Sequence, residues 1–338
     1  MNPRLGSTLH YRLLGRSGVR VSSLCLGTVF FGTQVAEPDA SAIIHAALDA
    51  GINFLDTAET YPRPHYGVSE SVVGRALRGR RQEVVLATKK RYEPASFRSG
   101  TPADRGLSRH QIVEAVEASL RRLQTDYLDL YYPHQVDPDT ELEITLRAFD
   151  DLLSAGKVRA IGLSNYPAWL TVESLWIADR RSFANPVCVQ TLYNLLARDV
   201  ERELVPACAR HGLSLVTYSP LAGGVLTGKY GAGEPPPDSR AAHVGHASDG
   251  RPSHIPLLTP ASLAAASRLR AVASEFDLSA AQAALAWSLC RPQVASVIFG
   301  ASSVAQLRHA LAADEVTLDE RAQTRLVESV SPAGSSAG

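Results

Sequence analysis

The sequence predicts an α/β protein with the (β/α)8, or TIM-barrel, fold, and three observations favour this class. Eight short apolar runs alternate with amphipathic segments along the chain, which is typical of a parallel sheet covered by helices. No linker divides these units into two domains. No GxGxxG motif follows an expected strand, which weakens the alternative of a doubly wound dinucleotide-binding sheet.

Taken in order, the elements begin with a hairpin. Residues 9–20 alternate apolar and polar about the turn at 15–18 and predict a β-hairpin at one end of the barrel. The expected strands are 21–26, 53–58, 83–89, 127–132, 158–164, 187–192, 213–218 and 294–299. The expected helices are 39–49, 69–79, 108–124, 141–155, 168–180, 201–210, 261–275, 279–290 and 303–312. Ser69 and Ser108 are expected N-caps, and Gln111 completes a capping box with Ser108.

Three segments fall outside the repeating units. Residues 229–258 are rich in Pro, Gly and His and too long for an ordinary connection, so we expect a lid or binding loop there. The amphipathic segment 317–330 predicts an extra C-terminal helix outside the barrel. We expect one barrel domain over residues 1–330 and a disordered tail at 331–338.

The composition narrows the classes of partner. The 34 basic and 34 acidic residues cancel, so no overall field favours nucleic acid or an anionic membrane, and a small-molecule partner is expected. No apolar run reaches the roughly 18 residues of a membrane span, and the N-terminus lacks a signal-peptide core. The cysteines Cys25, Cys188, Cys208 and Cys290 contain no CxxC pair. They predict a reduced, cytoplasmic protein without a metal site.

Three consecutive expected strands end in polar, titratable residues. Asp56 ends the strand that begins at Asn53, and Tyr61 follows five residues later. Lys89 ends the next strand, and His134 follows the one after that. Because the loops at the C-terminal strand ends of a barrel carry its chemistry, we expect these four side chains to converge at one opening.

This set of residue types suits proton donation to a carbonyl oxygen. A phenol is a weak acid, with an ordinary pKa near about 10, and an ammonium group beside it stabilises the phenolate. An aspartate holds the ammonium group charged and in position, and a histidine orients the substrate oxygen. The plainer alternative is a structural ion pair beside a tyrosine that anchors its proline-rich loop.

At these residues the chain resembles the aldo-keto reductase family. Besides the Asp56–Tyr61 stretch, the matching motifs are Ala87-Thr88-Lys89, Leu128–His134, Gly162-Leu163-Ser164-Asn165, Tyr218-Ser219-Pro220-Leu221 and Gly300-Ala301-Ser302-Ser303. They follow the family's order and spacing from about residue 10 to about residue 325. The resemblance implies a (β/α)8 barrel that reduces an aldehyde, ketone or sugar with NADPH. It assigns Tyr61 as the general acid, assisted by Asp56, Lys89 and His134.

The resemblance also implies a set of cofactor contacts. Ser164, Asn165 and Gln190 would hold the nicotinamide carboxamide, and Tyr218 would stack on its ring. The other implied contacts, mostly to the phosphates and the adenosine, are Gly27, Thr28, Ser219, Leu221, Gly223, Lys229, Arg240, Gly300, Ser302, Ser303 and Gln306.

Two departures from the family pattern stand out. His309-Ala310 replaces a frequent Glu-Asn pair near the adenine, which leaves NADH as an alternative to NADPH. Tyr132-Pro133 stands where Gln and an aliphatic residue are common, which predicts a reshaped pocket wall.

Aromatic residues and one cation after several strands are the candidate substrate contacts. They are Phe30, Phe31, Tyr66, Arg91, Tyr92 and Trp169. Aromatic walls with few cations suit a polar carbonyl compound or a sugar, although packing alone would also explain Phe31 and Trp169. An NAD(P)-dependent sugar dehydrogenase, a nucleotide-linked deoxysugar keto or enoyl reductase, and a cofactor-sensing regulatory subunit stay open as alternatives, as does a homo-oligomer.

Overall fold

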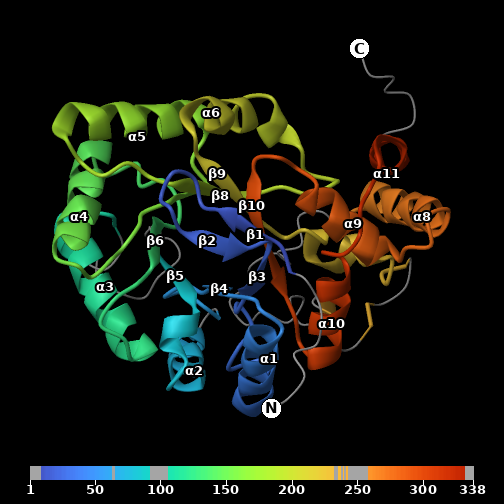
Figure 1. Cartoon of the computed structure of the whole chain (residues 1–338), viewed down its shortest axis with the longest axis horizontal. Helices are drawn as coiled ribbons and strands as arrows, with labels where there is room; N and C mark the ends of the chain where they lie inside the picture. The colour runs from blue at the N-terminus through green and yellow to red at the C-terminus, as the bar shows by residue number, and fades with distance from the viewer. Residues whose placement is uncertain are drawn as a thin grey trace.

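The core of the structure is an eight-stranded parallel sheet that curls into a nearly closed barrel (Figure 1). The computed structural model describes residues 9–62, 65–91, 106–231, 235–236, 239, 241–242 and 258–331. In spatial order the strands are β6 (Leu130–Pro133), β5 (Val85–Lys90), β4 (Phe54–Asp56), β3 (Leu24–Gly27), β10 (Val294–Gly300), β9 (Ser214–Tyr218), β8 (Cys188–Leu192) and β7 (Leu163–Ser164). Parallel bridges from Leu128 to Val158 and from Tyr131 to Ile161 link the two ends of the sheet. The predicted (β/α)8 class is confirmed.

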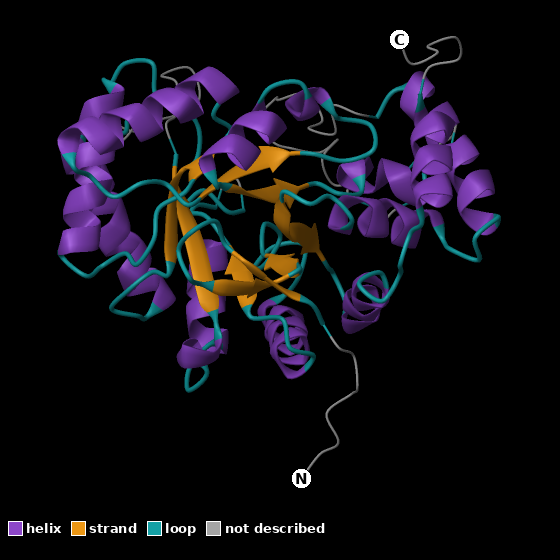
Figure 2. Cartoon of the chain, turned by 45° about the horizontal axis from the view of Figure 1, so that its top comes forward, coloured by secondary structure: helices purple, strands orange, loops and turns teal. Residues whose placement is uncertain are grey.

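Helices surround the sheet on its outer side (Figure 2). They are α1 (Glu37–Asp49), α2 (Val68–Ala76), α3 (Arg109–Leu123), α4 (Leu142–Ser154), α5 (Ala168–Arg181), α6 (Leu204–His211), α8 (Pro260–Ser274), α9 (Ala280–Leu289), α10 (Val304–Ala312) and α11 (Glu320–Val330). Short 3-10 helices are η1 (Arg81–Glu83), η4 (Asp199–Glu201) and η5 (Ala222–Thr227). The last helix, α11, packs against α8 and α9 to one side of the barrel. This confirms the additional C-terminal helix.

An N-terminal hairpin closes the end of the barrel at which the strands begin. It pairs β1 (Tyr11–Leu13) with β2 (Arg20–Ser22) in antiparallel fashion and lies across the middle of the barrel in Figure 1. Leu14 and Val21 are buried with the side chains of the barrel interior. The sequence predicted one strand at 21–26, but Ser23 divides it, because its N–H bonds to His10 and its hydroxyl to Asp314.

The barrel interior is a packed core. It contains small and branched side chains together with the larger Phe54 and Tyr132. A Cβ at Gly162 would lie 2.4 Å from Tyr132 Cε1, so the glycine leaves the space that this ring fills. The Tyr132 hydroxyl lies 3.5 Å from Cys188 Sγ. The Tyr132 ring itself lines no open pocket, because it is fully buried in this interior, and a reshaped pocket wall at Tyr132-Pro133 stays a prediction.

One of the two predicted helix caps is confirmed. Ser108 precedes α3 and forms the expected capping box with Gln111. Ser69 instead lies inside α2, whose N-cap is Gly67 in the left-handed conformation (φ 78°). Glycine reaches this conformation without the steric cost of a Cβ, so the helix begins before Ser69. The hydroxyl of Ser69 is thereby available to bond the end of β3, where it donates to the Thr28 carbonyl at 2.8 Å.

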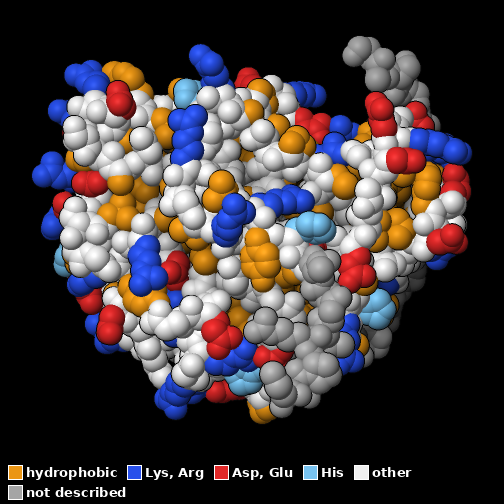
Figure 3. Space-filling model, viewed as in Figure 1, with side chains coloured by type: hydrophobic (Ala, Val, Ile, Leu, Met, Phe, Trp, Pro, Cys, Tyr) orange, Lys and Arg blue, Asp and Glu red, His pale blue; other side chains and the backbone are white. Residues whose placement is uncertain are grey.

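The face of the molecule that carries the hairpin has a mixed charge. Basic and acidic side chains are interspersed over it (Figure 3), in keeping with the balanced composition. Within the residues that the structure describes, no helix is both long and apolar enough to cross a membrane. Three of the four cysteines, Cys25, Cys188 and Cys208, are buried, and Cys290 is partly so.

Candidate active site

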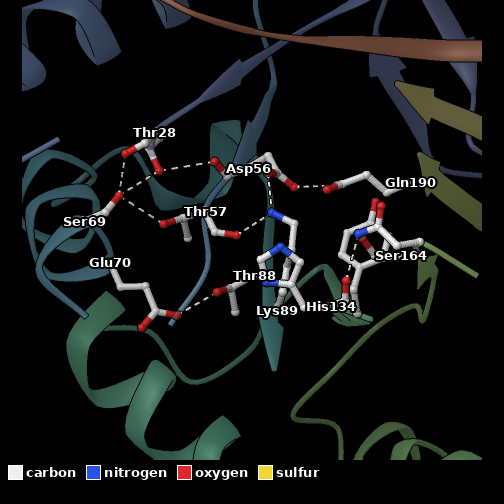
Figure 4. A network of polar contacts seen from close by, with 12 residues as sticks. Thr28, Asp56, Thr57, Ser69, Glu70, Thr88, Lys89, His134, Ser164 and Gln190 are labelled. Atoms are coloured by element: carbon white, nitrogen blue, oxygen red, sulfur yellow. Dashed lines mark hydrogen bonds and ion pairs between the residues drawn. The ribbon is translucent and has the colours of Figure 1, made fainter. Parts of the chain in front are cut away.

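The four predicted polar residues come together at the end of the barrel opposite the hairpin, and Figure 4 shows Asp56, Lys89 and His134 among them. Asp56 is the last residue of β4, Lys89 lies one residue before the end of β5, and His134 follows β6. Tyr61 lies in the loop that leaves β4. The sheet register places Asp56 beside Ala87, two residues before Lys89, and it places Lys89 beside Tyr132, two residues before His134.

Asp56 and Lys89 form a buried ion pair. The Lys89 ammonium group bonds Asp56 Oδ1 and also donates to the Thr57 carbonyl at 2.8 Å. Burial raises the pKa of Asp56, and the charge of Lys89 offsets part of this rise. Burial alone would lower the pKa of Lys89, but the neighbouring Asp56 and Tyr61 outweigh it, so the pKa of Lys89 is raised. Lys89 therefore stays an ammonium group at neutral pH.

Tyr61 and His134 complete the cluster. The Lys89 ammonium nitrogen lies 5.1 Å from the centre of the Tyr61 ring. The Tyr61 and His134 rings meet edge to face, with centroids 5.7 Å apart and planes inclined by 82°. The backbone fixes both residues, because Tyr61 O accepts from Ser69 N at 3.1 Å and His134 N donates to Lys90 O at 2.7 Å. A phenol, an ammonium group and an imidazole thus lie at one opening.

Two amide side chains predicted to hold the nicotinamide are bonded to members of this cluster. Gln190 Nε2 donates to Asp56 Oδ2 at 2.8 Å. Asn165 Nδ2 donates to the His134 carbonyl at 2.9 Å and to Ser164 Oγ at 3.1 Å. The Tyr218 hydroxyl donates to Asn165 Oδ1 at 2.8 Å, and burial raises the pKa of Tyr218 to about 12. The predicted carboxamide residues are therefore contiguous with the cluster.

The segment after β9 has the form of an anion cradle. Ser219, Ala222, Gly223 and Gly224 all have positive φ angles, between 50° and 96°. Backbone turns of this kind point N–H groups into a concavity that binds anionic oxygens, although the N–H groups of Ala222 and Gly224 already donate to Ser219 O and Leu221 O. Lys229 lies against this segment, since a Cβ at Gly224 would be 3.2 Å from its Nζ. Lys229 and the N–H groups that these turns do not use are the candidate contacts for the phosphates of a dinucleotide.

The remaining predicted cofactor residues border the same opening. Gly27 and Gly300 are paired at the ends of β3 and β10. Ser303 is the N-cap of α10 and accepts from Gln306 N, while Gln306 Oε1 accepts from Ser302 N at 3.0 Å. Thr28 is buried and donates through its N–H and its hydroxyl to the Asp56 carbonyl. Arg240 lies outside the described residues.

The predicted substrate residues differ in their exposure. Phe31 is only 1% exposed and packs in the main hydrophobic core. Trp169 is 65% exposed near the start of α5, and Tyr66 is 37% exposed just before α2. Phe30 is partly buried, Arg91 directly follows β5, and Tyr92 lies outside the described residues.

A second, partly buried ion pair, which the sequence did not single out, lies beside the first. Lys90 Nζ is 3.2 Å from Glu59 Oε1, and Arg91 N donates to the same oxygen at 3.0 Å. Glu59 belongs to the loop between Asp56 and Tyr61, and burial raises its pKa. The position of Glu59 within that short loop was the feature of the sequence that could have identified it. The pair ties this loop to the end of β5.

A third buried acid, Glu70 in α2, was also missed. Its carboxylate accepts from Thr88 Oγ1 and from Arg122 Nε, both at 2.6 Å. Glu70 is fully buried, so the two donors offset the cost of removing its charge from water. The contact fastens the helix after Tyr61 to the strand that carries Lys89 (Figure 4).

Comparison with known proteins identifies a family and several relatives of this chain. The model of the "Aldo/keto reductase family" matches residues 23–330. A "Probable voltage-gated potassium channel subunit beta" of Oryza sativa subsp. japonica is 40% identical over 305 residues, which cover 88% of this chain and 89% of that protein. The protein of the same name from Arabidopsis thaliana is 38% identical, with 91% and 92% covered. The "Uncharacterized oxidoreductase YrpG" of Bacillus subtilis (strain 168) is 38% identical, with 92% and 93% covered.

Proposed function

Since the chain belongs to the aldo/keto reductase family, we propose that it reduces an aldehyde or ketone to the alcohol with NADPH. The observation that carries this proposal is the buried Asp56–Lys89 pair, whose ammonium group faces the Tyr61 ring. The family match and the oxidoreductase relative support carbonyl reduction in general terms. A sugar carbonyl is the substrate class that we would screen first, because polar and aromatic side chains surround the opening.

Tyr61 is the proton donor in this proposal. Its phenol gives a proton to the carbonyl oxygen while a hydride adds to the carbonyl carbon, so the C=O group becomes CH–OH. Lys89 stabilises the phenolate that remains, and Asp56 keeps Lys89 charged and in place. His134, edge-on to Tyr61, orients the substrate oxygen. Water then returns a proton to the phenolate.

The cofactor supplies the hydride when it is bound. The N–H groups and Lys229 of the segment after β9 would hold its phosphates. Ser164, Asn165 and Gln190 would hold its carboxamide. We propose NADPH rather than NADH, with Ser302, Ser303 and Gln306 at the 2′-phosphate. Ala310 is buried, so its side chain offers no contact to an adenine. Because the frequent Glu-Asn pair is replaced here, NADH is assayed in parallel with NADPH.

The test is Tyr61→Phe, which removes the phenol proton and little else. We expect turnover of 4-nitrobenzaldehyde and glyceraldehyde with NADPH to fall by about 100- to 10,000-fold, the range of one general acid. The dissociation constant for NADPH, followed by quenching of protein fluorescence, should change less than about threefold. Unchanged turnover in the variant would contradict the proposal, and a wild type that binds neither NADPH nor NADH would refute it altogether.

A second candidate function is regulation of a membrane partner. Two plant relatives are named as probable subunits of voltage-gated potassium channels, which favours a subunit that senses the cofactor. Such a protein would bind NADPH tightly, turn over slowly and stay bound to a channel during purification. Rapid steady-state turnover without a membrane partner would favour the enzyme.

A further inference from the structure

The side chain of Gln190 connects opposite walls of the barrel. Gln190 is on β8 and Asp56 on β4, and these strands are four places apart in the eight-stranded order. The 2.8 Å bond from Gln190 Nε2 to Asp56 Oδ2 therefore crosses the interior (Figure 4). Both side chains are at least 95% buried. A hydrogen bond in such a dry setting is stronger than one at the surface.

Chemistry fixes the orientation of this amide. A carboxylate only accepts hydrogen bonds, so the NH2 group of Gln190 must face Asp56 and its Oε1 must point away. The two oxygens of Asp56 then have separate partners, with Lys89 at Oδ1 and Gln190 at Oδ2. Gln190 thus holds the carboxylate from the side opposite to the lysine.

The other titratable groups around Asp56 cannot replace this bond. Cys25 on β3, Tyr132 on β6 and Cys188 on β8 also face the carboxylate. Burial raises the pKa of each of the three above its ordinary value, to about 12 for Cys188. They are neutral at pH 7. Among the described residues that act on the Asp56 carboxylate, Lys89 is the only charged one.

We propose that Gln190 is a positioning residue for proton transfer, and that it holds the Asp56 carboxylate, and through it the Lys89 ammonium group, toward Tyr61. This inference rests on the function proposed above and deepens it. The resemblance to the aldo-keto reductase family assigns Gln190 only a contact to the nicotinamide carboxamide. Here one end of its amide is engaged with Asp56, and the other end is left for the carboxamide. Binding of the nicotinamide would then fix the Gln190 side chain, and with it the Asp56–Lys89 pair that assists Tyr61.

Loss of the Gln190 amide should shift the pKa of Asp56 in one direction, upward. The Gln190 bond favours the charged form of Asp56, so removing it moves protonation of Asp56 to higher pH. A protonated Asp56 no longer holds Lys89 by charge. The acid side of the kcat profile should therefore shift to higher pH. A hydrogen bond to a charged group is worth roughly a tenfold change in an equilibrium, so the acid limb of the profile should move by about one pH unit, while kcat on the alkaline side of this limb should change by less than about threefold.

The experiment compares wild type with Gln190→Met, which keeps the length of the side chain but has no donor. Protonation of Asp56 is followed in the protein without cofactor by infrared difference spectroscopy of its carboxyl band, assigned by its loss in Asp56→Asn. The kcat profile with 4-nitrobenzaldehyde and saturating NADPH is measured alongside it. Gln190→Glu is a second variant, in which two carboxyl groups share the site and the midpoint should rise further. Ser164→Ala is the matched control, because it removes a predicted carboxamide contact that does not touch Asp56.

The expected result is a higher Asp56 midpoint in both Gln190 variants and an infrared midpoint equal to wild type in Ser164→Ala, whatever that variant does to NADPH binding and turnover. If the Gln190 variants raise the KM for NADPH but leave the infrared midpoint and the kcat profile unchanged, Gln190 is a cofactor ligand alone and the inference is overturned. In that case wild-type turnover still stands. A wild type without NADPH-dependent turnover would instead refute the proposed function.

Discussion

Lys89 and Lys90 are neighbours in β5, both are buried, and they pair with two acids, Asp56 at the end of β4 and Glu59 in the loop that follows. Successive residues of a strand point to opposite faces, so the two ammonium groups face different surroundings. Lys89 meets Asp56 beneath the Tyr61 ring. Lys90 meets Glu59, which also accepts the Arg91 N–H. One pair faces the reacting group, and the other fastens the loop that carries it.

The acids do not distinguish the two pairs. Burial raises the pKa of both Asp56 and Glu59, and the nearby lysine offsets part of each rise. A perturbed carboxyl in a cleft is a candidate for function, but a structural ion pair is perturbed in the same way. The distinction comes from what lies next to the lysine. The Lys89 ammonium nitrogen lies 5.1 Å from the centre of the Tyr61 ring, whose phenol can release a proton.

The largest effect should come from Lys89→Met. Removing the cation leaves Asp56 buried without its charged partner, which costs about 3–5 kcal/mol of unfolding free energy. The phenolate of Tyr61 loses its stabilising charge, so kcat should fall by about 100- to 1,000-fold. Urea unfolding and steady-state turnover measure the two effects. A variant that retained most of its activity would place the assisting cation elsewhere.

The same variant tests the sign of the pH dependence. The pKa of Lys89 is raised on folding. Its contribution to stability is therefore complete below the ordinary lysine pKa of about 10.4, and it is lost as the pH rises through the higher folded value. In wild type, the contribution of Lys89 to the free energy of unfolding should be lost only in the alkaline range. Lys89→Met should not show this alkaline decrease in stability.

Lys90→Met should give a smaller effect of a different kind. Glu59 loses a charged partner but keeps the Arg91 N–H, so we expect about 1–3 kcal/mol of lost stability. Because Lys90 does not face Tyr61, kcat should fall by no more than about tenfold. The cause of this fall would be a shift of the loop that carries Glu59 and Tyr61, which misplaces the phenol. Parallel unfolding and kinetic measurements on the two variants decide this. Equal losses of kcat would erase the distinction between the pairs.

Much of the fold and of the central cluster was predictable from the sequence. The repeated alternation of apolar runs and amphipathic segments was enough for the barrel. Asp56, Lys89 and His134 could be placed together because each ends or follows a strand, and parallel strands bring such positions to one edge. Tyr61 followed from its short distance in sequence to Asp56.

The supporting contacts were not predictable, for a physical reason. Gln190 and Asp56 are 134 residues apart and meet only because the barrel closes. The acid that pairs with Lys90 depends on the path of the loop that contains Glu59. Ser69 reads as an N-cap, but the left-handed Gly67 moves the start of α2. Tyr132 turns inward because Gly162, from a strand end distant in sequence, leaves it space.

The measurement that tests the central claim most directly is a double-mutant cycle between Tyr61→Phe and Lys89→Met. The rate of NADPH oxidation is followed in a single turnover, with Lys89→Gln as a substitute should the methionine variant not fold. If Lys89 acts through the Tyr61 phenolate, the second substitution should lower the rate by less than about threefold once Tyr61 is Phe, as for residues that work as one unit. Losses that simply multiply would show that Lys89 acts independently of Tyr61 and would contradict the account.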